Sequence, residues 1–148
     1  MSPSSSRPHP STIFTARPDG SDQHKLGADG FFDTNPSWSP TGHWIVYISI
    51  RGEHANLYQI RPDSTDEHLL IPDVDANTLP VWSPDGRWIA VVRNIDNNPD
   101  IYRVRNDGSN LERLTTNPDF DGFPRWSPDG HCGLPTFPES VAHGTFIA

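Results

Sequence analysis

The stretch V-W-S-P-D-G-R-W-I-A-V-V, from Val81 to Val92, decides the fold of this chain of 148 residues. It joins a tryptophan, a Pro-Asp-Gly turn and a second tryptophan that opens a continuous apolar run. The stretch recurs, because Trp38 opens W-S-P-T-G and Trp126 opens another W-S-P-D-G. Both intervals between these tryptophans are 44 residues. A fixed period of this size indicates a repeat protein.

A second segment repeats with the same period. I-F-T-A-R-P-D-G-S-D begins at Ile13, L-Y-Q-I-R-P-D-S-T-D at Leu57 and I-Y-R-V-R-N-D-G-S-N at Ile101. A proline also lies two residues before each of the three tryptophans, and none of these matches needs a gap. We therefore predict a repeat domain over residues 12–130. Residues 1–11 are rich in Ser and Pro without periodicity, and we expect them to be disordered.

Each full repeat is predicted to contain four short strands. The 16 prolines and 11 glycines favour turns over long helices. The run W-I-V-Y-I-S is apolar without alternation, so both faces of this strand should be covered. The expected strands are Pro36 to Ser39, Trp44 to Ser49, Leu57 to Ile60 and His68 to Ile71 in the first full unit, Leu79 to Ser83, Trp88 to Arg93, Ile101 to Val104 and Leu111 to Thr115 in the second, Ile13 to Ala16 and His24 to Leu26 before them, and Phe123 to Trp126 after them.

The pattern fails after Gly130. Cys132 stands where the second tryptophan stands in the earlier units, and Gly133 and Pro135 fall inside what should be a buried strand. Proline removes a donor from the strand ladder and is tolerated mainly at sheet edges. We therefore expect residues 131–148 to be an irregular segment. Either the chain ends irregularly or the gene has been altered there.

A repeat of about 40–45 residues with four short strands is typical of a β-propeller blade. One four-stranded sheet cannot bury both of its faces alone, whereas stacked blades bury them against each other. The predicted fold class is therefore all-β, a partial β-propeller of four-stranded antiparallel blades. It has two full blades and an incomplete blade at each end. Propellers usually have about 4–8 blades. Our hypothesis is that two chains pair as a homodimer, and the rival interpretation is a fragment of a longer protein.

The composition argues against several classes of partner. The formal net charge of −8 disfavours nucleic acid and anionic membrane surfaces. No apolar run approaches the roughly 18 residues of a membrane span. The first residues lack the apolar core of a secretory signal, so the chain as written is expected to be cytoplasmic. Its single cysteine excludes a disulfide within the chain.

No catalytic or metal-binding motif stands out. G-x-S-x-G, a phosphate loop, H-E-x-x-H and paired C-x-x-C do not occur, and the seven histidines show no ligand spacing. Asp96 to Asp100 matches the first five positions of an EF-hand loop, but Ile101 occupies the position that requires glycine. We interpret Asp96 to Asp100 as a hairpin loop. The chain is expected to be no enzyme, with no catalytic residue, cofactor or metal.

Polar residues recur in the loop before the first strand of each unit, at Asp33, Asn77 and Asp121. For Asp33 this loop is predicted over residues 27–35. Short carboxylates and amides at such positions usually cap local backbone N–H groups. The alternative is a ring of acidic groups near a propeller channel that binds a cation or a peptide amine. The three recurring tryptophans are interpreted as residues that pack blade against blade, rather than as binding aromatics.

Two motifs carry a family resemblance. P-x-W-S-P-D-G-R-W-I-A-V, followed by I-Y-x-V-x-x-D-G-S-x-x-x-x-L-T, resembles the repeat of TolB-like propellers, a relative of the WD-repeat blade. The resemblance extends from about Ile13 to Gly130, with Thr41 in place of Asp and Ser64 in place of Gly. Blades of this kind occur in the periplasmic TolB protein and in the lid domains of prolyl-oligopeptidase-like enzymes. TolB-like propellers typically have six blades, so two of these chains would pair as three plus three.

The resemblance implies a non-catalytic module that binds a protein or a peptide through loops at one face of the propeller. A second reading is a fragment of a propeller-gated serine peptidase that lacks its catalytic domain. A third is a truncated gene product without a function of its own. Fold alone does not choose among them.

Overall fold

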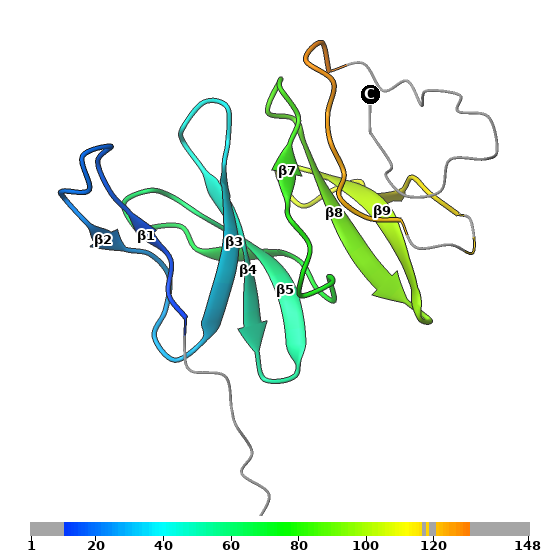
Figure 1. The fold of residues 1–148 in the computed structure, drawn as a ribbon, viewed down its shortest axis with the longest axis horizontal. Coiled ribbons are helices and arrows are strands. Elements are labelled where there is room, and N and C mark those ends of the chain that lie inside the picture. Colours follow the sequence, from blue (N-terminus) through cyan, green and yellow to red (C-terminus); the bar gives the residue numbers. More distant parts are fainter. Residues whose placement is uncertain (1–10, 117, 119–120, 131–148) are drawn as a thin grey trace, which may run out of the picture.

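The computed structural model describes residues 11–116, 118 and 121–130. Within these residues the chain forms three antiparallel sheets and no helix (Figure 1). A two-stranded sheet pairs β1 with β2, and two four-stranded sheets have the orders β3-β4-β5-β6 and β10-β9-β8-β7. The strands are β1 (Phe14–Thr15), β2 (His24–Lys25), β3 (Phe32–Trp38), β4 (Ile45–Arg51), β5 (His54–Ile60), β6 (His68–Ile71), β7 (Val81–Trp82), β8 (Trp88–Ile95), β9 (Asn98–Arg105) and β10 (Glu112–Arg113).

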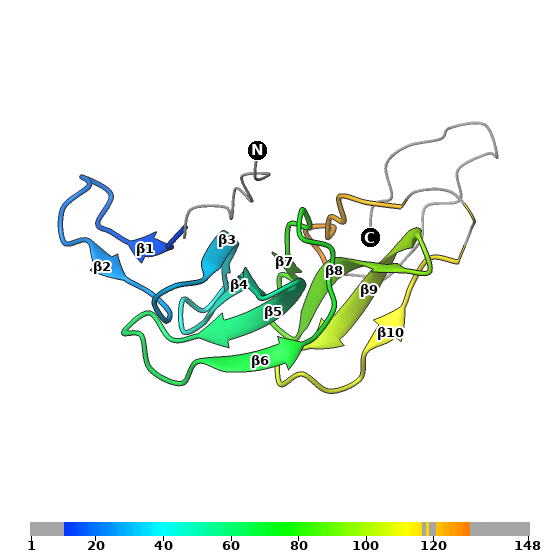
Figure 2. The same cartoon turned by 90° about the horizontal axis from the view of Figure 1, so that it is seen from below.

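The three sheets stand side by side in chain order, with β1 and β2 at one end and β7 to β10 at the other (Figure 2). β3 and β7, which open the two four-stranded sheets, contact each other and form the inner edge. β6 and β10 lie on the opposite, outer edge. This is the arrangement of neighbouring blades in a propeller, and it confirms the prediction of a partial all-β propeller.

The W-S-P-x-G motif closes the turn between the first two strands of each blade. The hydroxyl of Ser83 accepts a hydrogen bond from the backbone N–H of Trp88 at 2.9 Å, and the Trp88 carbonyl accepts the Ser83 N–H at 2.8 Å. Gly86 adopts a φ of 69° and donates its N–H to the Ser83 carbonyl. Ser39 and Trp44 make the same bonds in the preceding blade. The motif therefore recurs because it builds the same turn in each blade.

The central strands are buried on both faces, as their unbroken apolar sequence predicts. Val46 and Ile48 of β4 belong to a cluster that includes Val91 of the next blade. Ile45 and Tyr47 belong to another cluster, on the side of the two-stranded sheet. Complete burial of one such side chain stabilises the fold by about 1.5–3 kcal/mol. Stacking of blade on blade is thus the main source of the core.

The strand boundaries correct three expectations. Residues 27–35 are not all loop, because β3 begins at Phe32 and includes Asp33, which pairs with Ser49 of β4. The Asp96 to Asp100 hairpin loop is shorter than expected, since only Asp96 and Asn97 form the turn and β9 begins at Asn98. In both cases the pairing with β4 or β8 continues past the apolar run of the sequence, so β3 and β9 are longer than that pattern predicts.

The third correction concerns residues 123–126, which were expected to form a strand and form none. A strand needs a neighbour for its ladder, and the repeat places that neighbour within residues 131–148, outside the described residues. The expectations for residues 1–10 and 131–148 also lie outside them. Across the part of the chain that is described, no helix is long and apolar enough to cross a bilayer.

Candidate binding site

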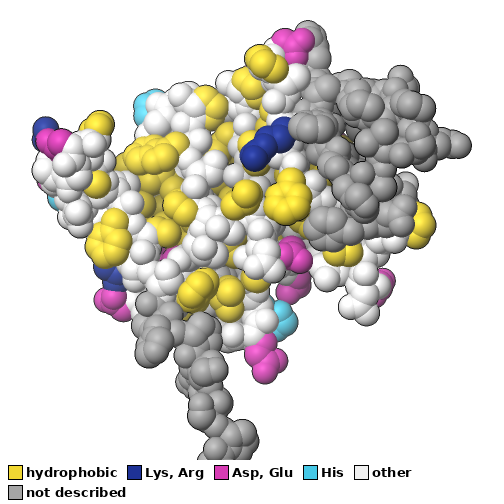
Figure 3. Space-filling model, viewed as in Figure 1, with side chains coloured by type: hydrophobic (Ala, Val, Ile, Leu, Met, Phe, Trp, Pro, Cys, Tyr) yellow, Lys and Arg dark blue, Asp and Glu magenta, His cyan; other side chains and the backbone are white. Residues whose placement is uncertain are grey.

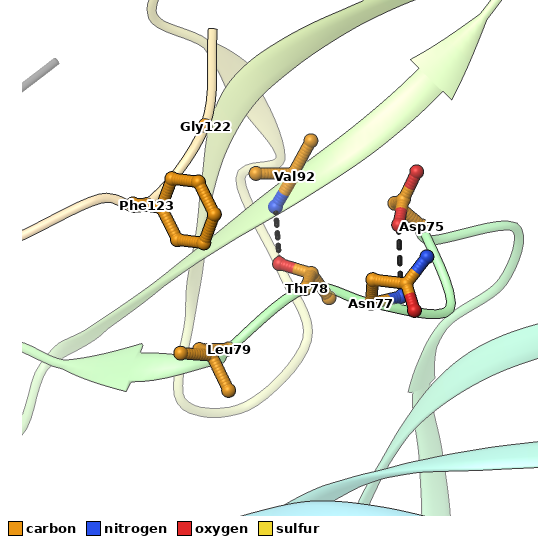
Figure 4. A pocket seen from close by; sticks show the side chains of 7 residues that line it. All are labelled: Asp75, Asn77, Thr78, Leu79, Val92, Gly122 and Phe123. Carbon is orange, nitrogen blue, oxygen red and sulfur yellow. Dashed lines mark hydrogen bonds between the residues drawn. The ribbon is translucent and has the colours of Figure 1, made fainter. Parts of the chain in front are cut away.

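A pocket of about 170 Å³ lies where the loop before β7 meets the segment before Trp126 (Figure 4). Phe123 is 64% exposed and Leu79 is also exposed, so the pocket has apolar side chains at its surface. Figure 3 shows further hydrophobic side chains exposed on the face that carries β3 and β7. The pocket is lined by Asp75, Asn77, Thr78, Leu79, Val92, Gly122 and Phe123.

Hydrogen bonds hold the polar side of this pocket in place. The buried Thr78 hydroxyl accepts the backbone N–H of Val92 at 2.8 Å, and the Thr78 carbonyl accepts the side-chain amide of Asn35 at 2.8 Å. Asp75 accepts the backbone N–H of Asn77 at 2.8 Å and donates its own N–H to the Val92 carbonyl. The loop is therefore fixed to both neighbouring blades. A fixed, partly apolar hollow with a few polar groups is suited to binding one side chain of a ligand.

The structure places the three recurring polar residues differently. Asn77 is exposed and lines the pocket, and Asp121 is buried beside the lining residue Gly122. Asp33 is buried in β3, away from the pocket. The backbone N–H of Asp33 binds the Ser11 carbonyl, and that of Asp121 binds the Pro99 carbonyl. Their backbones thus tie each inner segment to the blade before it.

Side-chain capping follows a different pattern from the expected one. In the loop before β7 the capping carboxylate belongs to Asp75, two residues before Asn77. Neither carboxylate oxygen of Asp33 has a hydrogen-bond partner among the described residues. Burial raises the pKa of Asp33, against the opposing influence of the Ser49 hydroxyl and the Arg51 charge. Asp33 is therefore a buried acid whose charged form is disfavoured by burial, and its side chain caps no backbone N–H among the described residues.

A polar cluster that sequence reasoning missed surrounds Asp33, between the two-stranded sheet and the first full blade. The Tyr47 hydroxyl donates a hydrogen bond to Glu67, and the Arg51 guanidinium donates another to the same carboxylate at 2.5 Å. The pKa of Tyr47 is raised mainly by burial and secondly by the hydrogen bond to the Glu67 carboxylate. Arg51 also lies 3.8 Å above the ring of Tyr58, within the range of a cation–π contact.

The signal for this cluster was a departure from the repeat. Val91, Ile95 and Leu111 occupy the positions that correspond to Tyr47, Arg51 and Glu67 in the next blade. Three polar residues that replace apolar ones at one blade interface indicate a local network. Motifs common to all repeats cannot reveal these residues, because they occur in one repeat only.

The recurring tryptophans do pack blade against blade in two of three cases. The Trp82 indole N–H donates to the Ser37 carbonyl at 3.2 Å, and that of Trp126 donates to the Val81 carbonyl at 2.9 Å. Trp82 is 7% exposed, whereas Trp38 is 51% exposed. The packing interpretation is therefore wrong for Trp38 within the described residues, because no earlier inner strand precedes it there.

Comparison with known proteins finds likeness in structure alone, since no protein-family model and no curated protein matches the chain. TolB from Acinetobacter baumannii is similar at a TM-score of 0.70 and 23% identity, over 80% of this chain and 30% of that one. A putative TolB from Agrobacterium tumefaciens is similar at a TM-score of 0.68 and 31% identity, over 82% of this chain and 43% of that one. This chain thus spans less than half of each.

Other propellers match at lower identity. A chain of a nidogen/laminin complex has a TM-score of 0.63 and 17% identity, over 80% of this chain and 45% of that one. Enzymes also match, among them a putative dipeptidyl aminopeptidase IV at 16% identity and an oligogalacturonate lyase at 19%. The shared blade architecture and the likeness to the two TolB structures therefore place this chain among the TolB-like β-propellers, as part of such a propeller.

Proposed function

We propose that this chain is a non-catalytic module that binds a protein or a peptide at the pocket between the loop before β7 and Phe123. The observation that carries the proposal is a fixed hollow with apolar side chains exposed at its surface. Exposed aromatic and aliphatic groups around a pocket are typical anchors of protein recognition. Among the described residues, no group of three or more His, Cys, Asp or Glu side chains could hold a metal ion.

The pocket chemistry favours an extended peptide that inserts one apolar side chain. Phe123 and Leu79 would cover that side chain, and the exposed Asn77 amide can donate to and accept from the peptide backbone. The half-buried Asp75 carboxylate and the net charge of −8 favour a neutral or basic peptide over an acidic one. Of the three recurring residues, Asn77 is the one that we assign to the ligand, while Asp33 and Asp121 support the scaffold.

A random peptide library displayed against the full chain tests the proposal, with titration calorimetry on the selected peptides. Phe123→Ala and Leu79→Ala should each weaken binding at least about 5-fold, which corresponds to about 1 kcal/mol and exceeds the effect of truncating most interface residues. Leu111→Ala is the matched control, since Leu111 is exposed but does not line the pocket. Equal affinities for all three variants, or no selected peptide, would overturn the assignment.

A second candidate is a fragment of a propeller-gated serine peptidase. It is favoured by the likeness to a putative dipeptidyl aminopeptidase IV, of which this chain covers 19%. A truncated gene product is the third candidate. The nucleotide sequence beyond codon 130 separates these readings. A following G-x-S-x-G domain supports the peptidase, and a W-I-A-type strand in another frame supports truncation.

A further inference from the structure

Phe123, which lines the pocket, has a backbone conformation that aromatic residues rarely adopt. Its φ is 57°, in the left-handed region, where a bulky side chain is strained. The other non-glycine residues with positive φ in the described part of the chain are all Asp, Asn or Ser. Asn and Asp tolerate this region because their short polar side chains can bind the local backbone. Phe123 is therefore the one bulky residue that is held there among the described residues.

The repeat shows that this position does not impose a left-handed backbone on an apolar residue. Asn35 and Leu79 are the residues equivalent to Phe123 at the period of 44. Asn35 has a φ of 53°, and its side-chain amide donates to the Thr78 carbonyl of the next blade at 2.8 Å. Leu79 has no positive φ. An apolar residue can thus take an ordinary conformation at this position, and Phe123 does not.

The segment around Phe123 is fixed on both sides. The Asp121 backbone N–H donates to the Pro99 carbonyl at 3.0 Å. The Trp126 indole N–H donates to the Val81 carbonyl at 2.9 Å. Strained residues persist only where the surrounding structure determines their conformation, and they cluster at ligand-binding sites. Phe123 is 64% exposed, so burial of its ring offsets little of the strain.

The pocket beside this ring has room for one aromatic side chain. Its volume is about 170 Å³. An apolar cavity of about 150 Å³ is enough to hold a benzene molecule. Gly122, which also lines the pocket, has no side chain to fill it, whereas the equivalent residues are Thr34 and Thr78. Figure 4 shows the Phe123 ring on one side of this space and Asp75 on the other.

We propose that Phe123 is the specificity-determining residue of this pocket, and that the peptide side chain it selects is aromatic. Two aromatic rings attract each other in offset or edge-to-face contact beyond the effect of the area that they bury. The exposed Phe123 ring therefore favours an aromatic side chain over an aliphatic one, and the strained backbone keeps the ring at the pocket. This inference rests on the proposed function, because it names the kind of side chain that a bound peptide inserts.

Two small probes test the selection on the full chain. N-acetyl-phenylalanine amide and N-acetyl-cyclohexylalanine amide carry rings of similar size, but only the first ring is aromatic. In NMR titrations both probes should shift the amide signals of Val92 and Gly122, which line the pocket. The dissociation constant of the phenylalanine probe should be at least about 3-fold lower.

The outcomes separate this inference from peptide binding itself. Equal dissociation constants, or a lower one for the cyclohexylalanine probe, overturn the aromatic selection and leave the proposed function standing. The absence of shifts with both probes also overturns the selection. The peptide library then decides the proposed function separately.

Phe123→Asn tests whether the ring is held at the pocket at a cost in stability. Asparagine tolerates the left-handed region, as Asn35 shows at the equivalent position. The variant should therefore raise the urea midpoint and lose the shifts from the phenylalanine probe. Phe14→Asn is the matched control, because Phe14 is 59% exposed, has no positive φ and does not line the pocket. It should not raise the midpoint, and it should bind the probe as wild type does.

An unchanged or lower midpoint in Phe123→Asn, or an equal rise in Phe14→Asn, contradicts the strained conformation. Probe binding that persists in Phe123→Asn contradicts the role of the ring in selection. The midpoint is measured without any ligand, so it tests the strained ring even where peptide binding fails.

Discussion

Replacement of Thr78 by valine should destabilise the fold through one buried hydrogen bond. The Thr78 hydroxyl accepts the backbone N–H of Val92 at 2.8 Å, and both residues are buried. Valine has nearly the shape of threonine but no acceptor. The Val92 N–H would therefore stay buried without a partner, since Asp75 binds the Val92 carbonyl and not its N–H.

The expected cost follows from that single orphaned donor. A buried donor without a partner costs about 1–3 kcal/mol in the free energy of unfolding. Thr78→Ser keeps the hydroxyl and loses one methyl group, for which burial contributes about 0.8 kcal/mol. Thr78→Val should therefore be the less stable of the two variants, although it retains more apolar surface. A purely hydrophobic account of this site predicts the opposite order.

Urea denaturation followed by circular dichroism measures the effect. With a slope of about 1–3 kcal/mol per molar urea, a loss of 2 kcal/mol lowers the midpoint by about 1 M. Hydrogen exchange at the Val92 amide gives a local readout, and it should accelerate in Thr78→Val and stay protected in Thr78→Ser. A valine variant as stable as the serine variant, with a protected Val92 amide, would refute the reasoning.

Three further predictions concern the buried polar groups. Asp33→Asn should raise stability at neutral pH, because burial raises the pKa of Asp33 and its charged form is disfavoured in the fold. The stability that Asp33 contributes is present below the pKa that it has in the unfolded chain, and it is lost as pH rises through its higher pKa in the folded chain. The urea midpoints of wild type and variant should therefore converge in acid and diverge toward neutral pH. Ser83→Ala should cost about 1–3 kcal/mol, because it removes the acceptor for the Trp88 N–H. The Ser83 hydroxyl also lowers the pKa of Asp85 in the folded chain, and the stability that this contributes is lost as pH falls through that lowered pKa. The loss of stability in acid should therefore be smaller in Ser83→Ala, which unfolding measurements across acidic pH would show. Tyr47→Phe should destabilise by about 1–3 kcal/mol through loss of the bond to Glu67, and a double-mutant cycle with Glu67→Gln should show coupling; independent effects would count against the network.

The period of 44 residues is enough to predict the architecture. Each W-S-P-x-G turn needs its serine, its glycine and the following tryptophan at fixed spacing, because Ser83 binds both backbone groups of Trp88. Equal spacing then forces equal blades. The unbroken apolar run at Trp88 predicted a strand covered on both faces for the same local reason.

The binding pocket could not be found in this way. Asp33, Asn77 and Asp121 are equivalent in sequence, yet two are buried and only Asn77 lines the pocket. Their exposure depends on which neighbouring segment lies against each loop, and that segment belongs to another repeat. Equivalence in the repeat fixes the position of a residue within its blade, but it does not fix which residues of the adjoining blade contact it.

The repeat in the sequence thus predicted the turns and most of the strands, because these depend on hydrogen bonds and spacing inside one repeat. Only the tertiary structure decided that Trp82 is buried while Trp38 is open, and that Tyr47, Arg51 and Glu67 meet around Asp33. The physical reason is that burial and pKa are set at the junctions between blades, where residues far apart in the chain exclude water together.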